Sequence, residues 1–196
     1  MNTHSKIESG LIIKKIPYGD ADEIITVLFQ NSGLRRLFVT GSRKSKKRFM
    51  GLIDHFAHLK FDYTIRTEGL ARIKSIAEID PGFSDTLKNI ETFALIHYLL
   101  ELILSLTAEE APLPELYQLL LSLPKNLTTE GFQAKNVIMY TRQVLECCGY
   151  AVDFKTELHP EKDDDCASAF KRLVAFGESL AQKQSRVAPF VLSTCF

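Results

Sequence analysis

The stretch that decides the fold of the N-terminal part is HFAHLKFDYTIRTEGLARIKSIAEI, residues 55–79. Both halves have a period of two, which is typical of β-strands. In the first half, one side of an extended chain carries Ala57, Leu59, Phe61 and Tyr63, and the other carries Phe56, His58, Lys60 and Asp62. In the second half, one side carries Ala71, Ile73, Ser75 and Ala77, and the other carries Leu70, Arg72, Lys74 and Ile76. Thr67-Glu68-Gly69 between them predicts a turn.

Three more segments upstream predict strands. They are GLIIKKI (10–16), EIITVLF (23–29) and LRRLFVT (34–40), and turn-forming clusters separate them at 17–20 and 31–33. Five short strands within 80 residues, without helical periodicity, indicate a small closed sheet. We therefore expect a five-stranded OB-like barrel.

The chain beyond Pro81-Gly82 predicts helices. Residues 86–106 are dense in Leu and Ile, and a leucine face follows Pro114. Further helices are expected over 132–148, with Gly149 as a left-handed cap, and after the acidic run 163–165. The apolar tail 187–196 is ambiguous.

Two local signals in this region predict helix boundaries. The spacing of Thr107 and Glu110 is that of a capping box, which predicts a helix start. Pro124 is expected to end the helix that begins near Pro114. The fold class expected is thus α+β, with an OB-fold nucleic-acid-binding domain over 1–80 and an all-helical domain over 81–196.

Charge is divided unevenly along a chain whose formal net charge is zero. Residues 1–80 hold fourteen Lys/Arg against nine Asp/Glu, and residues 81–196 hold ten against fifteen. A basic module suits a polyanion such as nucleic acid. The cations are densest in GSRKSKKRFMG, residues 41–51, which contains Arg43, Lys44, Lys46, Lys47 and Arg48. A loop of this kind between two strands is suited to phosphates.

Other residues in the first 80 extend the predicted nucleic-acid interface. Further cations are Arg35 and Arg36, of which only one can share the face of the loop, and Arg66, Arg72 and Lys74. Aromatic rings bind single strands by stacking on bases. Of Phe38, Phe49, Phe56, Phe61 and Tyr63, we expect three or four to be buried and one or two exposed. Phe49, inside the basic loop, is the best candidate for an exposed ring.

Catalytic and metal-binding patterns are absent from the sequence. No Walker loop, nucleophile elbow, zincin or dinucleotide-binding motif occurs, and the four cysteines lack a zinc-site spacing. The polar N-terminus shows no secretory signal, and the most apolar segment is too short to span a bilayer. We expect no enzyme activity, no cofactor, no metal, no membrane association and a cytoplasmic location.

The order of these motifs resembles the RecO family of DNA repair proteins. The N-terminal pattern of that family falls at Tyr18-Gly19-Asp20-Ala21-Asp22, Gly33 and Gly41-Ser42-Arg43-Lys44. Its helical pattern falls at Tyr98, Glu101, Leu102, Glu109, Glu110 and Pro112, followed by VLECCGY at 144–150. The four-cysteine zinc motif of many members is missing from 151–165. The chain thus resembles a short member without zinc.

This resemblance implies an OB fold followed by a helical domain, and the function of a recombination mediator. RecO proteins bind single- and double-stranded DNA, anneal complementary strands, bind single-stranded-DNA-binding protein and act with RecR to load RecA. The resemblance also implies a place at the nucleoid. Two alternatives remain: a protein-interaction adaptor built on an OB fold, and an RNA-binding factor without DNA annealing activity.

Overall fold

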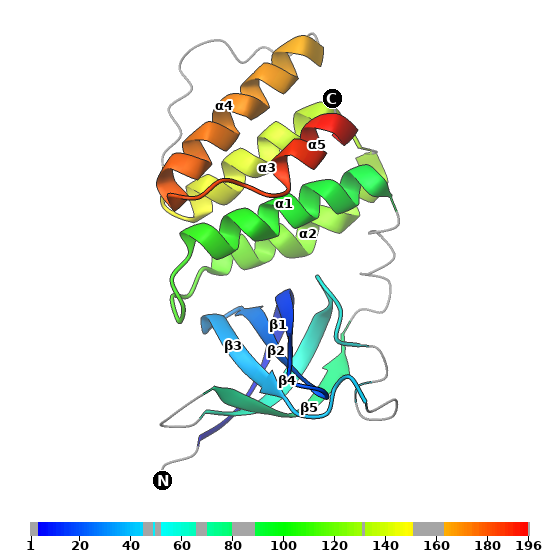
Figure 1. The fold of residues 1–196 in the computed structure, drawn as a ribbon, viewed down its shortest axis with the longest axis vertical. Coiled ribbons are helices and arrows are strands. Elements are labelled where there is room, and N and C mark those ends of the chain that lie inside the picture. The colour runs from blue at the N-terminus through cyan, green and yellow to red at the C-terminus, as the bar shows by residue number, and fades with distance from the viewer. Residues whose placement is uncertain are drawn as a thin grey trace. The chain divides into compact units, whose positions relative to one another are not determined.

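The computed structural model describes residues 4–44, 49, 52–65, 70–79, 89–130, 132–150 and 163–195 (Figure 1). The chain forms two compact units. The first joins residues 1–85 to residues 108–117, and the second joins 86–107 to 118–196. Residues 108–117 therefore pack with the N-terminal unit, although they lie beyond the predicted domain boundary at residue 80.

The first unit is a closed five-stranded barrel with the strand order β1-β2-β3-β5-β4. All neighbouring strands are antiparallel except β3 and β5, which are parallel. The α+β class and the OB-like barrel are confirmed. The strands are β1 (His4–Tyr18), β2 (Asp22–Phe29), β3 (Gly33–Val39), β4 (His58–Ile65) and β5 (Ala71–Glu78).

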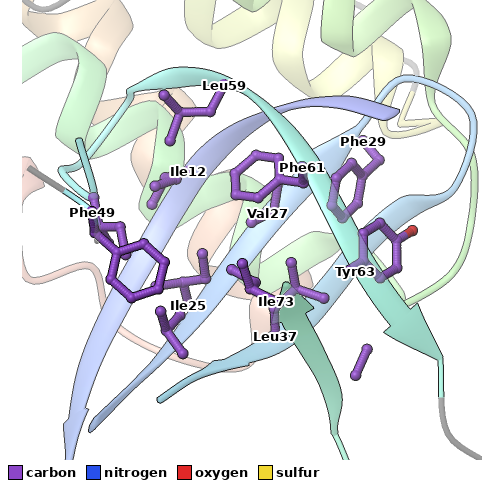
Figure 2. Packing of buried hydrophobic residues seen from close by; sticks show 13 residues of the cluster. Ile12, Ile25, Val27, Phe29, Leu37, Phe49, Leu59, Phe61, Tyr63 and Ile73 are labelled. Carbon is purple, nitrogen blue, oxygen red and sulfur yellow. The ribbon is translucent and has the colours of Figure 1, made fainter. Parts of the chain in front are cut away.

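Large apolar side chains from every strand fill the barrel (Figure 2). The ring of Phe29 stacks on Tyr63 at 5.1 Å between centroids and meets the edge of Phe61 at 5.4 Å. These three side chains are fully buried. The inward positions of β4 are those that the period of two predicts, Leu59, Phe61 and Tyr63.

The predicted alternation is wrong at two places. Phe56 is fully buried instead of lying with the polar side, because β4 begins only at His58 and Phe56 has a φ of 64°. In β5 the register shifts opposite Asp62 and Tyr63, so Lys74 is skipped in the pairing. A bulge of this kind exchanges the two faces of the strand for the residues that follow it, so side chains expected outside point inward and the reverse. Ile76, not Ser75 or Ala77, therefore packs against the core.

The second unit is helical, as expected. Its helices are α1 (Ile90–Leu106), α2 (Pro114–Glu130), α3 (Ala134–Cys147), α4 (Asp163–Ala181) and α5 (Ala188–Cys195). The first turn of α2 belongs to the first unit. Helix α1 packs against α3, α4 and α5, and α3 packs against α4. Gly149 has a φ of 89°, which confirms the left-handed position after α3.

Both predicted helix boundaries are wrong. Thr107 ends α1 instead of starting a helix, because its backbone N–H donates to the carbonyl of Ile103. Helix α2 continues through Pro124. Proline removes one helical hydrogen bond, but burial of Leu123 and Leu127 on either side of it stabilises the continuous helix.

Candidate nucleic-acid interface

The basic loop begins as a turn that is held against the β1–β2 turn. Gly41, with a φ of 70°, donates its N–H to the Asp22 carboxylate at 2.7 Å. The backbone N–H of Arg43 donates to the carbonyl of Ala21 at 3.0 Å, and its guanidinium donates to the carbonyl of Gly19 at 3.2 Å. Arg43 and Lys44 are exposed. The turn thus fixes the backbone and leaves both cations in solvent.

Four predicted cations cannot be placed. Lys46, Lys47 and Arg48 of the basic loop, and Arg66 after β4, lie outside the described residues. Their part in nucleic-acid binding stays a prediction.

Phe49 is not the exposed ring that we expected. Only 3% of its surface is exposed, and the ring lies inside the barrel cluster (Figure 2). The N–H of Leu52 donates to its carbonyl at 2.7 Å. Burying a phenyl ring is worth far more than exposing it, so the core takes the ring even though cations flank it in sequence. Base stacking on Phe49 is therefore ruled out in this conformation.

The partly exposed aromatic of the expected set is Phe38, and Tyr18 joins it. The other four rings of that set are buried. Tyr18, which is 56% exposed, meets Phe38 edge to face at 5.5 Å. The Arg72 guanidinium carbon lies 5.3 Å from the centroid of the Phe38 ring. We call Tyr18, Phe38 and Arg72 the aromatic–arginine cluster.

This cluster adjoins the basic turn along the chain. Tyr18 precedes Gly19, whose carbonyl accepts from the Arg43 guanidinium. Stacking surface and cations are the two groups that single-stranded nucleic acid requires. The sequence did not single out Tyr18 as a stacking ring, because the five candidate rings were those interleaved with the cations of residues 35–74. Its position at a strand end, next to a glycine turn, was the available signal.

Lys74 lies on the same strand as Arg72 but has different contacts. It is exposed and donates to the Ser5 hydroxyl at 2.6 Å, and that hydroxyl donates to Asp62 at 3.2 Å. This chain of hydrogen bonds connects β5, β1 and β4. Lys74 is thus partly engaged within the barrel.

Arg35 and Arg36 each form an ion pair with the segment before α2. The Arg35 guanidinium lies 2.9 Å from the Glu110 carboxylate, and the Arg36 guanidinium lies 2.7 Å from the Glu109 carboxylate. Arg35 is mostly covered and Arg36 is exposed, with side-chain exposures of 18% and 55%. These two arginines therefore do not share contacts with the basic turn, and each already has a carboxylate as its partner.

A buried polar cluster lies in the barrel wall. Glu8 accepts hydrogen bonds from the Ser32 hydroxyl at 2.7 Å and from the Tyr63 hydroxyl. Burial, followed by this carboxylate, raises the pKa of Tyr63, so the phenol remains a donor. Lys6 lies 3.3 Å from Glu8 and balances its charge. All three partners contact Oε1 of Glu8, whereas the buried Oε2 has no hydrogen-bond partner in the described part of the chain.

Neither metal sites nor membrane spans are found in the part of the chain that the structure describes. No group of three or more His, Cys, Asp or Glu side chains there is arranged to hold a metal ion. None of the helices described is long and apolar enough to cross a bilayer.

Comparison with protein families matches both parts of the chain. Residues 1–81 match the family model "Recombination protein O N terminal", and residues 87–194 match "Recombination protein O C terminal". The chain belongs to the RecO family. The break between the two RecO matches, at 82–86, falls within the region where the sequence predicted the change from strands to helices.

Curated relatives share the family name and are 30–31% identical to this chain over the matched residues. A "DNA repair protein RecO" of Myxococcus xanthus is 31% identical over 113 residues, which cover 58% of this chain and 46% of that protein. One of Thermodesulfovibrio yellowstonii is 30% identical over 147 residues, covering 74% and 58%. One of Syntrophus aciditrophicus is 31% identical over 155 residues, covering 77% and 59%. The chain matches about half to three fifths of the length of these relatives.

Proposed function

We propose that this RecO-family chain is a DNA-binding mediator of recombinational DNA repair. In this role it binds single- and double-stranded DNA, anneals single strands and assists the loading of RecA, with RecR and single-stranded-DNA-binding protein as partners. The role is binding and not catalysis. The name of the relatives, DNA repair protein RecO, supports the repair role.

One observation supports DNA binding most directly. The exposed cations Arg43 and Lys44 stand on a turn that is fixed by backbone hydrogen bonds next to Tyr18. Phosphates need positive charge, and unpaired bases need an exposed ring. Neighbouring segments of the barrel thus carry both kinds of group, exposed cations and an exposed ring, while the other aromatic rings stay in the core.

The first test measures how DNA affinity depends on salt. The five loop cations Arg43, Lys44, Lys46, Lys47 and Arg48 would contribute a log–log salt slope of about −3.5 on single strands, at roughly −0.7 per phosphate. Replacing all five by Gln should remove that contribution and weaken binding. A filter-binding titration of a single-stranded oligonucleotide over a range of salt concentrations measures both.

A matched control removes the same charge from the helices. The control variant replaces five exposed helical-unit cations by Gln, namely Lys125, Lys135, Lys171, Arg172 and Arg186. It should retain most of the salt slope. Equal losses in both variants would show that binding follows net charge alone, and a flat wild-type salt response would contradict DNA binding by the loop.

Further assays separate this proposal from its alternatives. Competition between DNA and RNA of equal length reports an RNA-binding factor, because such a factor requires the 2′-hydroxyl. Annealing of complementary strands reports the mediator activity. A pulldown from cell extract, with and without nuclease, reports RecR and single-stranded-DNA-binding protein, and capture of other proteins without DNA would favour the adaptor.

A further inference from the structure

The edge of β3 is covered by a segment from beyond the predicted domain boundary. β5 pairs with β3 only at Leu37 and Phe38, which leaves the start of β3 without a strand neighbour on that side. The segment before α2 takes this place. Leu34 forms a parallel bridge with Glu109, and the N–H of Glu110 donates to the carbonyl of Leu34 at 2.9 Å.

The backbone of this segment is held tightly against β3. Gly33 has a φ of 67°, and a Cβ built on it would lie 2.1 Å from the carbonyl oxygen of Ala111. Glu110 also has a positive φ, 63°. Non-glycine residues adopt this conformation only where their surroundings fix it. The main chain of 109–111 is therefore a fixed part of the barrel wall.

The two glutamate side chains of the segment are much less constrained than its backbone. Glu109 and Glu110 are 51% and 63% exposed, yet their carboxylates lie on Arg36 and Arg35. Exposed ion pairs of this kind contribute little, because water and salt screen them. Either carboxylate can thus turn into solvent while its backbone remains in place.

A cavity of about 380 Å³ lies where these four charged side chains meet. Ile65, Leu70 and Ala71 complete its lining. The Nε of Arg35 is buried and has no hydrogen-bond partner in the described structure. Arg35 thus lines this space and also has one unpaired donor, which is covered in this conformation. Arginine binds phosphate through several N–H groups at once, which a single carboxylate does not use fully.

We propose that Arg35 and Arg36 form a second phosphodiester site, which the chain's own Glu109 and Glu110 carboxylates occupy until nucleic acid displaces them. This inference rests on the proposed function, since it presupposes that the barrel binds nucleic acid. The glutamates act as built-in competitors. They weaken the binding of isolated phosphates to the arginines. A nucleic-acid strand that is already bound by the basic turn displaces them.

The test removes the competitors without removing side-chain volume. In Glu109→Gln/Glu110→Gln, single-stranded DNA should bind at least about three-fold more tightly, because no ion pair has to break before phosphates reach the arginines. The salt slope should stay close to that of the wild type, since the same phosphates are bound in both proteins. Filter binding of one oligonucleotide at several salt concentrations measures both.

The control variant changes net charge equally in the same unit. Glu78→Gln/Glu115→Gln removes two exposed carboxylates that have no ion pair among the described residues. It should tighten DNA binding much less than the test variant does. If Gln at 110 disturbs the positive φ, then Glu109→Gln/Glu110→Asn is the second variant, because Asn tolerates this conformation better.

A mutant cycle makes the assignment specific to the arginines. Arg35→Gln/Arg36→Gln should weaken DNA binding in both backgrounds, and about three-fold or more further when Glu109 and Glu110 are already replaced. Equal losses in both backgrounds, or equal affinities of the test and control variants, would overturn the second site. Loss of salt-dependent binding in the wild type would instead overturn the proposed function itself, so the two failures are distinguishable.

Discussion

At the residue scale, Tyr18 is the residue that tests whether the proposed nucleic-acid interface binds bases as well as phosphates. Its ring is 56% exposed and is supported edge to face by Phe38. Stacking on an aromatic ring is worth about 1–3 kcal/mol per base. We therefore expect Tyr18→Ala to weaken single-stranded DNA binding roughly ten-fold. The salt slope should not change, since no charge is removed.

Conservative variants at this position isolate the ring. Tyr18→Phe should bind like the wild type, and Tyr18→Leu, which retains apolar surface but no aromatic face, should bind like Tyr18→Ala. Fluorescence titrations with an unstructured oligonucleotide measure all three. Equal binding by Tyr18→Ala and the wild type would exclude a base on this ring.

Phe49 should behave as a core residue despite its basic neighbours. Removing a buried phenyl group costs about 3–5 kcal/mol, so Phe49→Ala should lower the free energy of unfolding by roughly that amount. Phe49→Leu should cost less and retain DNA affinity. Denaturant unfolding together with DNA binding separates the roles. A stable Phe49→Ala protein that no longer binds DNA would contradict a purely structural role.

The contrast between these two rings shows a limit of sequence reasoning. The number of buried aromatics was predictable, because a small barrel requires large side chains in its core. Their identity was not. Phe49 enters the core from a loop that has no periodicity, whereas Phe38 faces outward from a strand.

At the element scale, Gly33 permits the segment before α2 to replace a strand neighbour of β3. Gly33→Ala would strain a positive φ and place a Cβ against the Ala111 backbone. We expect a loss of about 2–4 kcal/mol in the free energy of unfolding, from left-handed strain together with overpacking. Thermal or denaturant unfolding measures this loss.

Gly19→Ala is the matched control for this close approach. Gly19 also has a positive φ, 60°, but nothing lies within 4 Å of a Cβ built there. Gly19→Ala should lower the free energy of unfolding by only about 1 kcal/mol, which is the cost of the left-handed strain. Equal costs at the two positions would show that the contact with Ala111 has no energetic weight.

Element positions could be predicted well, and their ends and partners could not. All five strands follow from local periodicity and turn residues, which act over a few positions. The bulge in β5, the passage of α2 through Pro124 and the docking of 108–117 on the barrel depend on contacts between distant segments. No local pattern contains that information. The ion pairs of Arg35 and Arg36 could not be predicted either, because they also join segments that are distant in the sequence.

At the scale of the whole molecule, the charge asymmetry of the sequence is only partly the charge of a binding surface. The basic half retains Arg43 and Lys44 in solvent, whereas two of its arginines are paired with glutamates from the acidic half of the sequence. Sequence counts assign these glutamates to the helices. The structure assigns them to the barrel unit, where they reduce its positive field.

The helical unit depends on one long-range carboxylate, and this gives its stability a pH dependence. Glu101 of α1 accepts hydrogen bonds from the Ser185 hydroxyl at 2.6 Å and from the backbone N–H groups of Arg186 and Val187. Burial alone would raise its pKa, but these hydrogen bonds and the Lys183 charge outweigh burial and hold the pKa below the usual value of a glutamate. The carboxylate thus fixes the segment that leads into α5.

The sign of the pH effect follows from this lowered pKa. Stability from Glu101 is fully present above the unfolded pKa, about 4.3 for a glutamate, and is lost as pH falls through the lower folded pKa. Glu101→Gln should cost roughly 1–2 kcal/mol near neutral pH, because it weakens charge-assisted hydrogen bonds. The difference between wild type and variant should shrink as pH falls below about 4. Urea unfolding followed by helical circular dichroism at a series of pH values measures this, and a difference that is constant with pH would contradict the role of the carboxylate charge.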